Sequence, residues 1–401
     1  MTALLTVLLA CYLLGGLLPL CTTRPYLQNL FAHGCAAAAG VAGLVLGVAG
    51  LLSTAPLTLS LASNIPQLTF ALRLDPLAAF FVLTISLVGL AASVYAYGYV
   101  EEFSGRVSVG LLGSLLNGFL LSMTLVVLAD NGFFFLILWE VMSLLSYVLV
   151  VTEHEKPGVR EAGLFYLIMT HVGTAFIILT FLIFFQETGS FSFEAFRHPD
   201  QQLPEGLRSV AFFTALIGFG AKAGIVPLHV WLPYAHPAAP SHISALMSGV
   251  MIKTAIYGLI RVYFDFMGGV FPWWWGFTLL VLGTVSALLG VMYALMEHDL
   301  KSLLAFHSVE NIGIILLGIG AGMIFHTYGL HELAALGLLA GLYHTINHAA
   351  FKALLFLGAG ALQFATHTRH IEEYGGLLRR MPWTGAFFLV GAVSIAALPP
   401  T

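Results

Sequence analysis

Charged side chains are scarce in this chain. Only 8% of its 401 residues are Asp, Glu, Lys or Arg, whereas a soluble domain carries roughly 25%. The formal net charge is -4, so the chain lacks the basic excess that binds nucleic acid. Hydrophobic residues make up 59% of the sequence, and the mean hydropathy is +0.95. This composition excludes a soluble enzyme, a nucleic-acid-binding domain and a disordered chain, and it indicates a polytopic membrane protein.

Cysteine is also rare, with only Cys11, Cys21 and Cys35 in the whole sequence. They have no C-x-x-C spacing, so neither an iron–sulfur cluster nor a structural zinc site is expected. Their odd number argues against a disulfide framework. The glycine-rich runs GFGAKAG and GIGAG lack the spacing of a phosphate-binding loop. We therefore expect no cofactor and no metal in this chain.

Long apolar runs recur along the sequence. A membrane-spanning helix needs about 20 mostly apolar residues, and barrel strands would alternate apolar and polar residues instead. The first run has no positive n-region of a signal peptide, so we interpret it as a span. Neither of the longest polar connections, 53–75 and 186–208, is large enough for a second domain. The predicted fold class is an all-α polytopic helix bundle. About twelve spans are predicted, near 1–20, 31–52, 76–97, 108–128, 132–151, 163–185, 209–225, 241–263, 272–296, 302–325, 333–364 and 383–398.

The basic residues predict an orientation, because cytoplasmic loops carry an excess of Lys and Arg. If the spans alternate, one side of the membrane receives Arg24, Arg106, Lys156, Arg160, Lys301, Arg369, Arg379 and Arg380. The other side receives Arg73, Arg197, Arg208 and Arg261. The larger set is expected in the cytoplasm of a cell whose inner membrane holds the protein. The N-terminus is then expected outside.

The last apolar run stops at Thr401, directly after Pro399 and Pro400. Either a twelfth helix ends at the membrane surface, or the sequence is a fragment. We expect a fragment.

The most informative ionisable residues inside predicted spans are Glu140, Lys222, Lys253 and Lys352. Each charge at mid-membrane costs about 2.5–3.5 kcal/mol on insertion scales. One interpretation is a static ion pair between Glu140 and one lysine that holds two helices together. At least two lysines would still lack a carboxylate partner, and a buried lysine without one can exchange a proton. The set therefore favours a chain of titratable groups along a hydrated path.

Histidines extend this chain in the later spans. His344, His348 and Lys352 are four residues apart, which places them on one helix face. The spacing predicts a proton path, and the alternative is a zinc site, which lacks the Glu of H-E-x-x-H and any cysteine. His307 and Glu310 are three residues apart on another helix.

Five secondary candidates accompany these residues: Lys301, which could equally be a cytoplasmic flank, Glu310, His171, His229 and His242. A helix break is predicted near 226–241, where Pro227 and Pro233 remove backbone donors. Interrupted helices beside an ion path are a recurring device of transporters, although a surface loop is the simpler alternative.

The run GAKAGIVPLHVWLPYAHPAAPSHISALMSGVMIKTAIYGLIRV resembles the antiporter-like membrane subunits of respiratory complex I, multisubunit cation/proton antiporters and membrane-bound hydrogenases. Within that family, DLKSLLAFHSVENIGIILLGIGAG and LYHTINHAAFKALLFLGAGALQFATHTRHIEEYGGLLRRMP resemble the hydrogenase-4 and formate hydrogenlyase branch. The resemblance covers most of 75–400.

The resemblance implies a fold of two inverted five-helix repeats with broken helices. The N-terminal peripheral spans would occupy 1–75, and a third span with its link 76–107. The first repeat would occupy 108–263, and an incomplete second repeat 272–401. The resemblance also implies that Glu140 and Lys222 form a pair that gates proton movement, and that Lys253 is the central residue of the eighth helix. His307, His344, His348 and Lys352 would follow along the midplane.

The predicted function is therefore a proton-translocating membrane subunit of a hydrogenase or related NADH-quinone-oxidoreductase-like complex. The resemblance places nickel–iron and iron–sulfur centres in partner subunits. Because Glu, Lys and His serve H⁺ and Na⁺ alike, a Na⁺/H⁺ antiporter subunit without a redox partner is one alternative. A non-conducting membrane scaffold, with its charges locked in static pairs, is the other.

Overall fold

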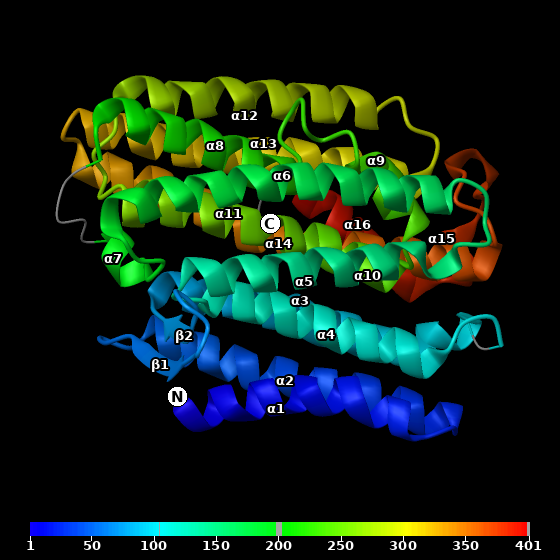
Figure 1. Ribbon diagram of the computed structural model, residues 1–401. Helices are drawn as coiled ribbons and strands as arrows, with labels where there is room; N and C mark the ends of the chain where they lie inside the picture. Colours follow the sequence, from blue (N-terminus) through cyan, green and yellow to red (C-terminus); the bar gives the residue numbers. More distant parts are fainter. Residues whose placement is uncertain (104, 198–202, 399–401) are drawn as a thin grey trace.

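The computed structural model describes residues 1–103, 105–197 and 203–398. The long helices run side by side as a bundle (Figure 1). Ten of them, within the described residues, are long and apolar enough to cross a membrane. The ten spans are built from α1 (Thr2–Leu17), α2 (Pro25–Leu51), α3 (Pro76–Tyr99), α4 (Val109–Leu128), α5 (Gly132–Val150), α6 (Val159–Thr188), the run of α10 (Ser241–Leu246) and α11 (Ile252–Ile260), α12 (Trp273–Ala294), α13 (Leu300–Thr327) and α14 (His331–Thr366). The predicted all-α membrane bundle is confirmed.

Two of the twelve predicted spans are helices that are not both long and apolar enough to be counted as membrane-crossing. The first is α8, Glu205–Ala223, whose 19 residues include Glu205, Arg208 and Lys222. The second is α16, Pro382–Ile395, which has 14 residues and follows the short helix α15, Leu377–Arg380. Pro399 and Pro400, at the end of the last apolar run, lie outside the described residues.

One small sheet was missed by the sequence reasoning, which treated 53–75 only as a polar connection. Strands β1 (Leu57–Ala62) and β2 (Thr69–Leu74) pair antiparallel, with Leu57 opposite Leu74 and Ala62 opposite Thr69. The run LTLSLA alternates apolar and polar residues with period two, which is the signal of a half-buried strand. The hairpin lies at the same end of the bundle as the N-terminus (Figure 1).

The chain is interrupted after α8. Gly224 adopts a left-handed conformation with φ of +81°, and a Cβ there would lie 2.0 Å from Leu232. Residues 224–231 turn, and the short helix α9, Leu232–Ala238, continues from them. α8 and α9 together therefore form two parts of one broken helix.

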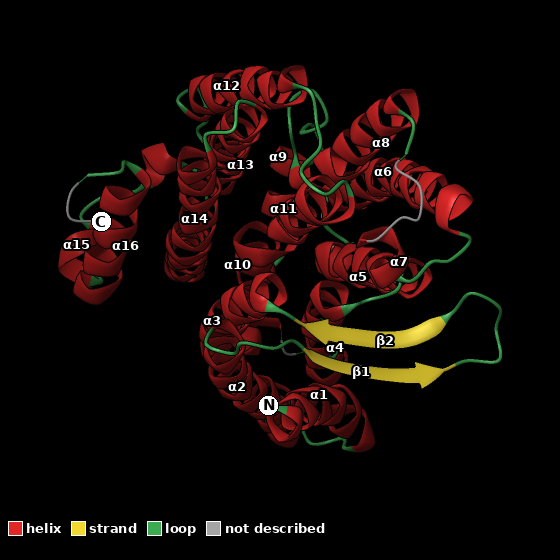
Figure 2. Ribbon diagram, turned by 90° about the vertical axis from the view of Figure 1, so that its left-hand side faces the viewer, coloured by secondary structure: helices red, strands yellow, loops and turns green. Residues whose placement is uncertain are grey.

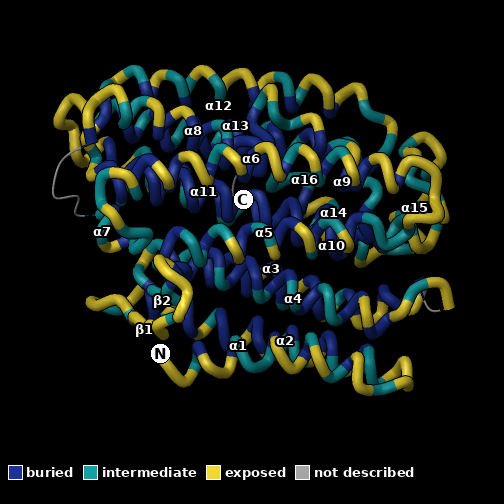
Figure 3. Tube along the Cα trace, viewed as in Figure 1, coloured by how far each residue is buried: buried dark blue, intermediate teal, exposed yellow. Residues whose placement is uncertain are grey.

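The following span contains two π-helical segments, Met247–Met251 and Arg261–Phe266, on either side of α11. Residues 241–263 of this span are all buried (Figure 3). Viewed from the hairpin end, it lies between α1–α4 on one side and α12–α14 with α16 on the other (Figure 2). Its Lys253, on α11, has no exposed surface. Single-turn π-helical segments are frequent at functional sites.

Ion pairs close the hairpin end of the bundle. Arg261 bonds Asp75, the N-cap of α3, and Asp265 at 3.0 Å. Arg197, from the short helix α7 (Phe193–Arg197), bonds Asp265 at 2.9 Å and Asp130 at 3.0 Å. Burial alone would raise the pKa of the Asp75 carboxyl, but its hydrogen bond and charge interaction with Arg261 lower it overall. These pairs join four separate segments at one end of the spans.

Candidate functional site: a buried polar axis

Lys222 lies near the C-terminus of α8, buried at the helix break, with 1% of its surface exposed. Its Nζ donates to the Ser143 hydroxyl at 2.9 Å and to the Tyr166 hydroxyl at 2.8 Å. Tyr166 in turn contacts the Ser146 hydroxyl at 2.5 Å. Two helices, α5 and α6, thus supply the oxygens that solvate this ammonium group.

Glu140 has a different partner. One carboxylate oxygen lies 3.2 Å from Nε2 of His171 on α6, and the other is buried without a hydrogen bond. Glu140 and Lys222 interact electrostatically but are not within ion-pair distance of each other. The two residues of the expected gating pair are therefore apart in this structure. Glu140 contacts His171, and Lys222 bonds the hydroxyls of Ser143 and Tyr166.

The two inner lysines donate to backbone carbonyls. Lys352 bonds the Leu304 carbonyl of α13 at 2.6 Å, and Lys253 bonds the Ser248 carbonyl inside the first π-helical segment. The Ser248 hydroxyl lies 2.8 Å from that of Ser308, also on α13. Both lysines have no exposed surface and no carboxylate partner among the described residues. They are close enough to affect each other electrostatically.

The histidine part of the axis joins α13 to α14. His344 and His348 stack with ring centroids 6.2 Å apart, as their spacing predicts. His344 Nε2 lies 2.9 Å from the Asn311 amide oxygen, and the Asn311 amide donates to the His307 carbonyl at 2.7 Å. His307 pairs with Glu310. Hydrogen bonds therefore join His344 to Asn311 and Asn311 to the backbone of His307, whereas neither ring nitrogen of His348 has a hydrogen-bond partner among the described residues.

One face of α13 receives most of these contacts. Lys301, Leu304, Ser308 and Asn311 follow one another at three or four residues, which is the spacing of neighbours on a helix face. This face carries the Lys301 ammonium, the carbonyl bound by Lys352, the hydroxyl that bonds Ser248 and the amide that bonds His344. The sequence reasoning named Lys301 but missed Ser308, because a lone serine in an apolar helix carries no signal.

The remaining predicted residues lie around the helix break. Pro227 and His229 are in the turn 224–231, and Pro233 is in the first turn of α9. His242 is fully buried on α10, with its ring 5.6 Å from that of Tyr99. No group of three or more His, Cys, Asp or Glu side chains that could hold a metal occurs in the part of the chain that the structure describes.

The chain matches the family described as NADH:quinone oxidoreductase/Mrp antiporter, transmembrane, over residues 129–401. The chain belongs to this family. It is a multi-span membrane protein, and the buried axis lies mostly within the matched region.

Two similar proteins come from different branches of the family. Hydrogenase-4 component B of Escherichia coli is 45% identical over 372 residues, covering 90% of this chain and 54% of that protein. A Na⁺/H⁺ antiporter subunit of Alkalihalophilus pseudofirmus is 32% identical over 338 residues, covering 83% of this chain and 41% of that protein. The chain spans about half the length of the first of these relatives.

A solved structure has the same fold over nearly all of this chain. A chain of the membrane-bound sulfane sulfur reductase, an archaeal respiratory membrane complex, superimposes with a TM-score of 0.85 at 28% identity. The superposition covers 99% of this chain and 63% of the other.

The hydroxyl contacts of Lys222 lead to a prediction about Tyr166. Tyr166→Phe keeps the ring but removes one of the two hydroxyls that bond the buried ammonium, and a hydrogen bond to a charged group contributes about 1.5–3 kcal/mol. We expect a lower free energy of unfolding, seen as a lower melting temperature of the purified protein in detergent. Tyr147→Phe on α5 is the matched control, because its hydroxyl makes no hydrogen bond among the described residues. Equal melting temperatures for the two variants would contradict the prediction.

Proposed function

We propose that this chain is a proton-translocating subunit of a membrane-bound hydrogenase-type complex, which couples electron transfer in partner subunits to proton movement. The observation that carries the proposal is the axis of buried lysines and histidines, solvated by hydroxyls and carbonyls instead of fixed carboxylates. An ammonium group held this way has no permanent counter-charge, so its proton can leave when a nearby charge moves. The 45% identity to a hydrogenase component favours this branch over the 32% identity to an antiporter subunit.

The path runs from Glu140 to the second half of the chain. Movement of charge at one end brings Glu140 and Lys222 together or apart, and this changes the proton affinity of Lys253. The proton then passes along the face of His344, His348 and Lys352. The separated Glu140 and Lys222 of this structure represent one of the two states. The axis crosses both predicted repeats, 108–263 and 272–401.

The surface around Glu140 supports a partner in the membrane. The Glu140 and His171 side chains are 30% and 47% exposed, although both lie inside spans. Ionisable groups that face lipid are costly, and they usually face protein or a water-filled cavity. We infer that a neighbouring membrane subunit covers this pair. The nickel–iron and iron–sulfur centres would lie in further subunits of the complex.

Purification of the full-length protein from its native membrane tests the assembly. We expect subunits that carry nickel–iron and iron–sulfur ligands to be identified with it by mass spectrometry. Recovery of small hydrophobic antiporter subunits alone would instead support Na⁺/H⁺ exchange. In that case the buried axis would still carry protons, but electron transfer in partner subunits would not power their movement.

Replacement of the gating pair tests the mechanism in the assembled complex. Lys222→Met and Glu140→Gln should each lower proton translocation per electron at least tenfold, because each removes a charge on which the transfer depends. The readout is acidification of sealed vesicles in the presence of the electron donor of the complex. Arg24→Met is the control, because Arg24 is an exposed cation just before α2 and is not part of the axis. If both variants assemble and translocate protons at the normal rate, the chain is a scaffold.

We also propose the orientation given by the basic residues, with the hairpin end of the bundle outside the cytoplasm. Because α1 begins at the hairpin end, Cys21, which follows α1, lies at the opposite end of the bundle. Cys21 is also exposed. In intact cells, an impermeant thiol reagent should modify Ser60→Cys in a chain without its native cysteines. The same reagent should not modify a chain that keeps only Cys21. The reverse labelling pattern would invert the orientation.

A further inference from the structure

One buried histidine has no role in the path described so far. His236 lies on α9 with no exposed surface, and neither ring nitrogen has a hydrogen-bond partner among the described residues. A buried polar atom left unsatisfied costs about 1–3 kcal/mol. Native structures pair such atoms with protein groups or with ordered water. Since no described protein group bonds either ring nitrogen, both are free to bond water.

The His236 ring is held at a defined place between two other rings. Its centroid is 6.1 Å from that of Trp231 and 5.3 Å from that of Phe356. Trp231 is anchored by a 2.8 Å hydrogen bond from Nε1 to the Ala221 carbonyl, next to Lys222. Phe356 is four residues after Lys352 on α14, and so on the same helix face. His236 therefore lies between the helix break and the lysine of the second repeat.

Three lysines interact electrostatically with the His236 ring. Lys253 on α11, Lys301 on α13 and Lys352 on α14 each interact with its ring electrostatically. These three come from three different helices, and two of them belong to the buried axis. All three lysines thus act electrostatically on the single ring of His236.

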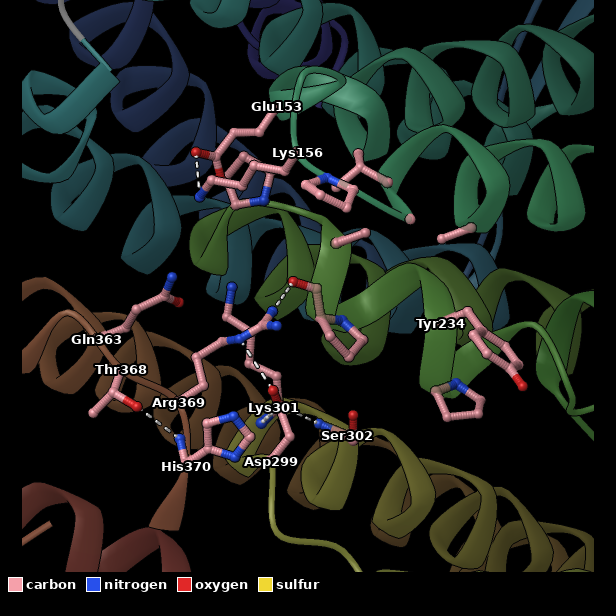
Figure 4. Close-up of a pocket in the computed structure, with 18 of the residues that line it drawn as sticks. Glu153, Lys156, Tyr234, Asp299, Lys301, Ser302, Gln363, Thr368, Arg369 and His370 are labelled. Carbon is pink, nitrogen blue, oxygen red and sulfur yellow. Dashed lines mark hydrogen bonds and ion pairs between the residues drawn. The ribbon is translucent and has the colours of Figure 1, made fainter. Parts of the chain in front are cut away.

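A polar cavity lies on the other side of Lys301. It has a volume of about 670 Å³ and is lined by charges of both signs, including Glu153, Lys156, Asp299 and Arg369 (Figure 4). Lys301 contributes to its lining, although only 3% of this residue is exposed. We name this cavity the vestibule.

Two cations of the vestibule hold the end of α9. The Lys301 ammonium donates to the Ala239 carbonyl at 2.9 Å, and Arg369 donates to the Pro237 carbonyl. Arg369 also pairs with Asp299 at 3.0 Å. The Ser244 hydroxyl bonds the carbonyl of His236 itself at 2.8 Å. The backbone of His236 is therefore fixed directly behind the wall of the vestibule.

We propose that His236 is a proton relay between the vestibule and the inner lysines, an inference that rests on the proton-translocating function proposed above. Imidazole suits this position because one nitrogen can accept a proton while the other releases one. A proton passes from the Lys301 ammonium through water to one ring nitrogen, and the ring becomes imidazolium. The proton on the other nitrogen then passes through water to the neutral amine of Lys352 or Lys253. The ring is left neutral in its other tautomer, and a half-turn of the ring restores the first.

His236→Phe in the assembled complex tests the relay. Phenylalanine preserves the stacking with Trp231 and Phe356 but cannot carry a proton. We expect proton translocation per electron, measured in sealed vesicles, to fall at least tenfold while the complex assembles normally. His33→Phe is the matched control, because His33 is also buried with neither ring nitrogen hydrogen-bonded among the described residues, but it lies on α2 and no lysine acts electrostatically on its ring. This control should translocate protons normally.

The outcomes separate the relay from the proposed function. If the unaltered complex translocates no protons, the proposed function fails. If it does translocate and Lys222→Met abolishes this, while His236→Phe keeps at least half of the normal rate, only the relay is overturned. Should His236→Phe fail to assemble, His236→Gln replaces it, since glutamine is polar but does not titrate. Assembly of the glutamine variant with normal translocation, or failure of both variants while His33→Phe assembles, would mean that His236 serves packing alone.

Discussion

The structure depends on how ammonium groups are held inside a membrane bundle without direct contact to a carboxylate in the described part of the chain. Lys222, Lys253, Lys301 and Lys352 are all at most 3% exposed, and none is ion-paired among the described residues. A buried charge is tolerated only when hydrogen bonds replace water. Here the acceptors are two hydroxyls for Lys222 and one backbone carbonyl for each of the other three. The helix irregularities provide places for two of those carbonyls, in the π-helical segment at Ser248 and at the end of α9.

This manner of solvation separates the axis from the ion pairs at the hairpin end. Arg261 and Arg197 hold carboxylates in direct contact, and such pairs join segments of the chain. The lysines of the axis contact neutral oxygens, so a change in charge nearby shifts their proton equilibrium without breaking an ion pair. The same protein thus uses its arginines for structure and its lysines for the proposed transfer. Arginine is suited to the first role because it does not lose its proton in proteins.

The proposed relay extends this argument to the helix break. Because α9 ends at Ala238 and Pro240 has no backbone N–H, the carbonyls of His236, Pro237 and Ala239 are left for side chains to bond, and Ser244, Arg369 and Lys301 donate to them. These contacts place His236 beside the vestibule and also beside the face of Lys352. A break in one helix therefore connects a surface cavity to the centre of the bundle.

Much of the fold could be predicted from the sequence, because the lack of charge and the length of the apolar runs permit few other structures. Ten of the twelve predicted spans are confirmed as helices long and apolar enough to cross a membrane. The hairpin was missed because its two strands are only six residues each and lie between much longer apolar runs. The boundaries of the spans were predicted only to within a few residues, since capping residues such as Asp75 and Asn131 give a weaker signal than hydrophobicity.

The sequence by itself determined which residues are unusual: Glu140, Lys222, Lys253, Lys352 and the histidines stand out because a charge in an apolar run is expensive wherever it lies. Spacing along one helix also predicted the stacked rings of His344 and His348. Only the tertiary structure decided the partners. Glu140 contacts His171 instead of Lys222, and the unremarkable Ser308 and His236 acquire their positions from helices more than 50 residues away. The reason is that helical periodicity orders side chains along one element, whereas contacts between elements depend on how the whole bundle packs.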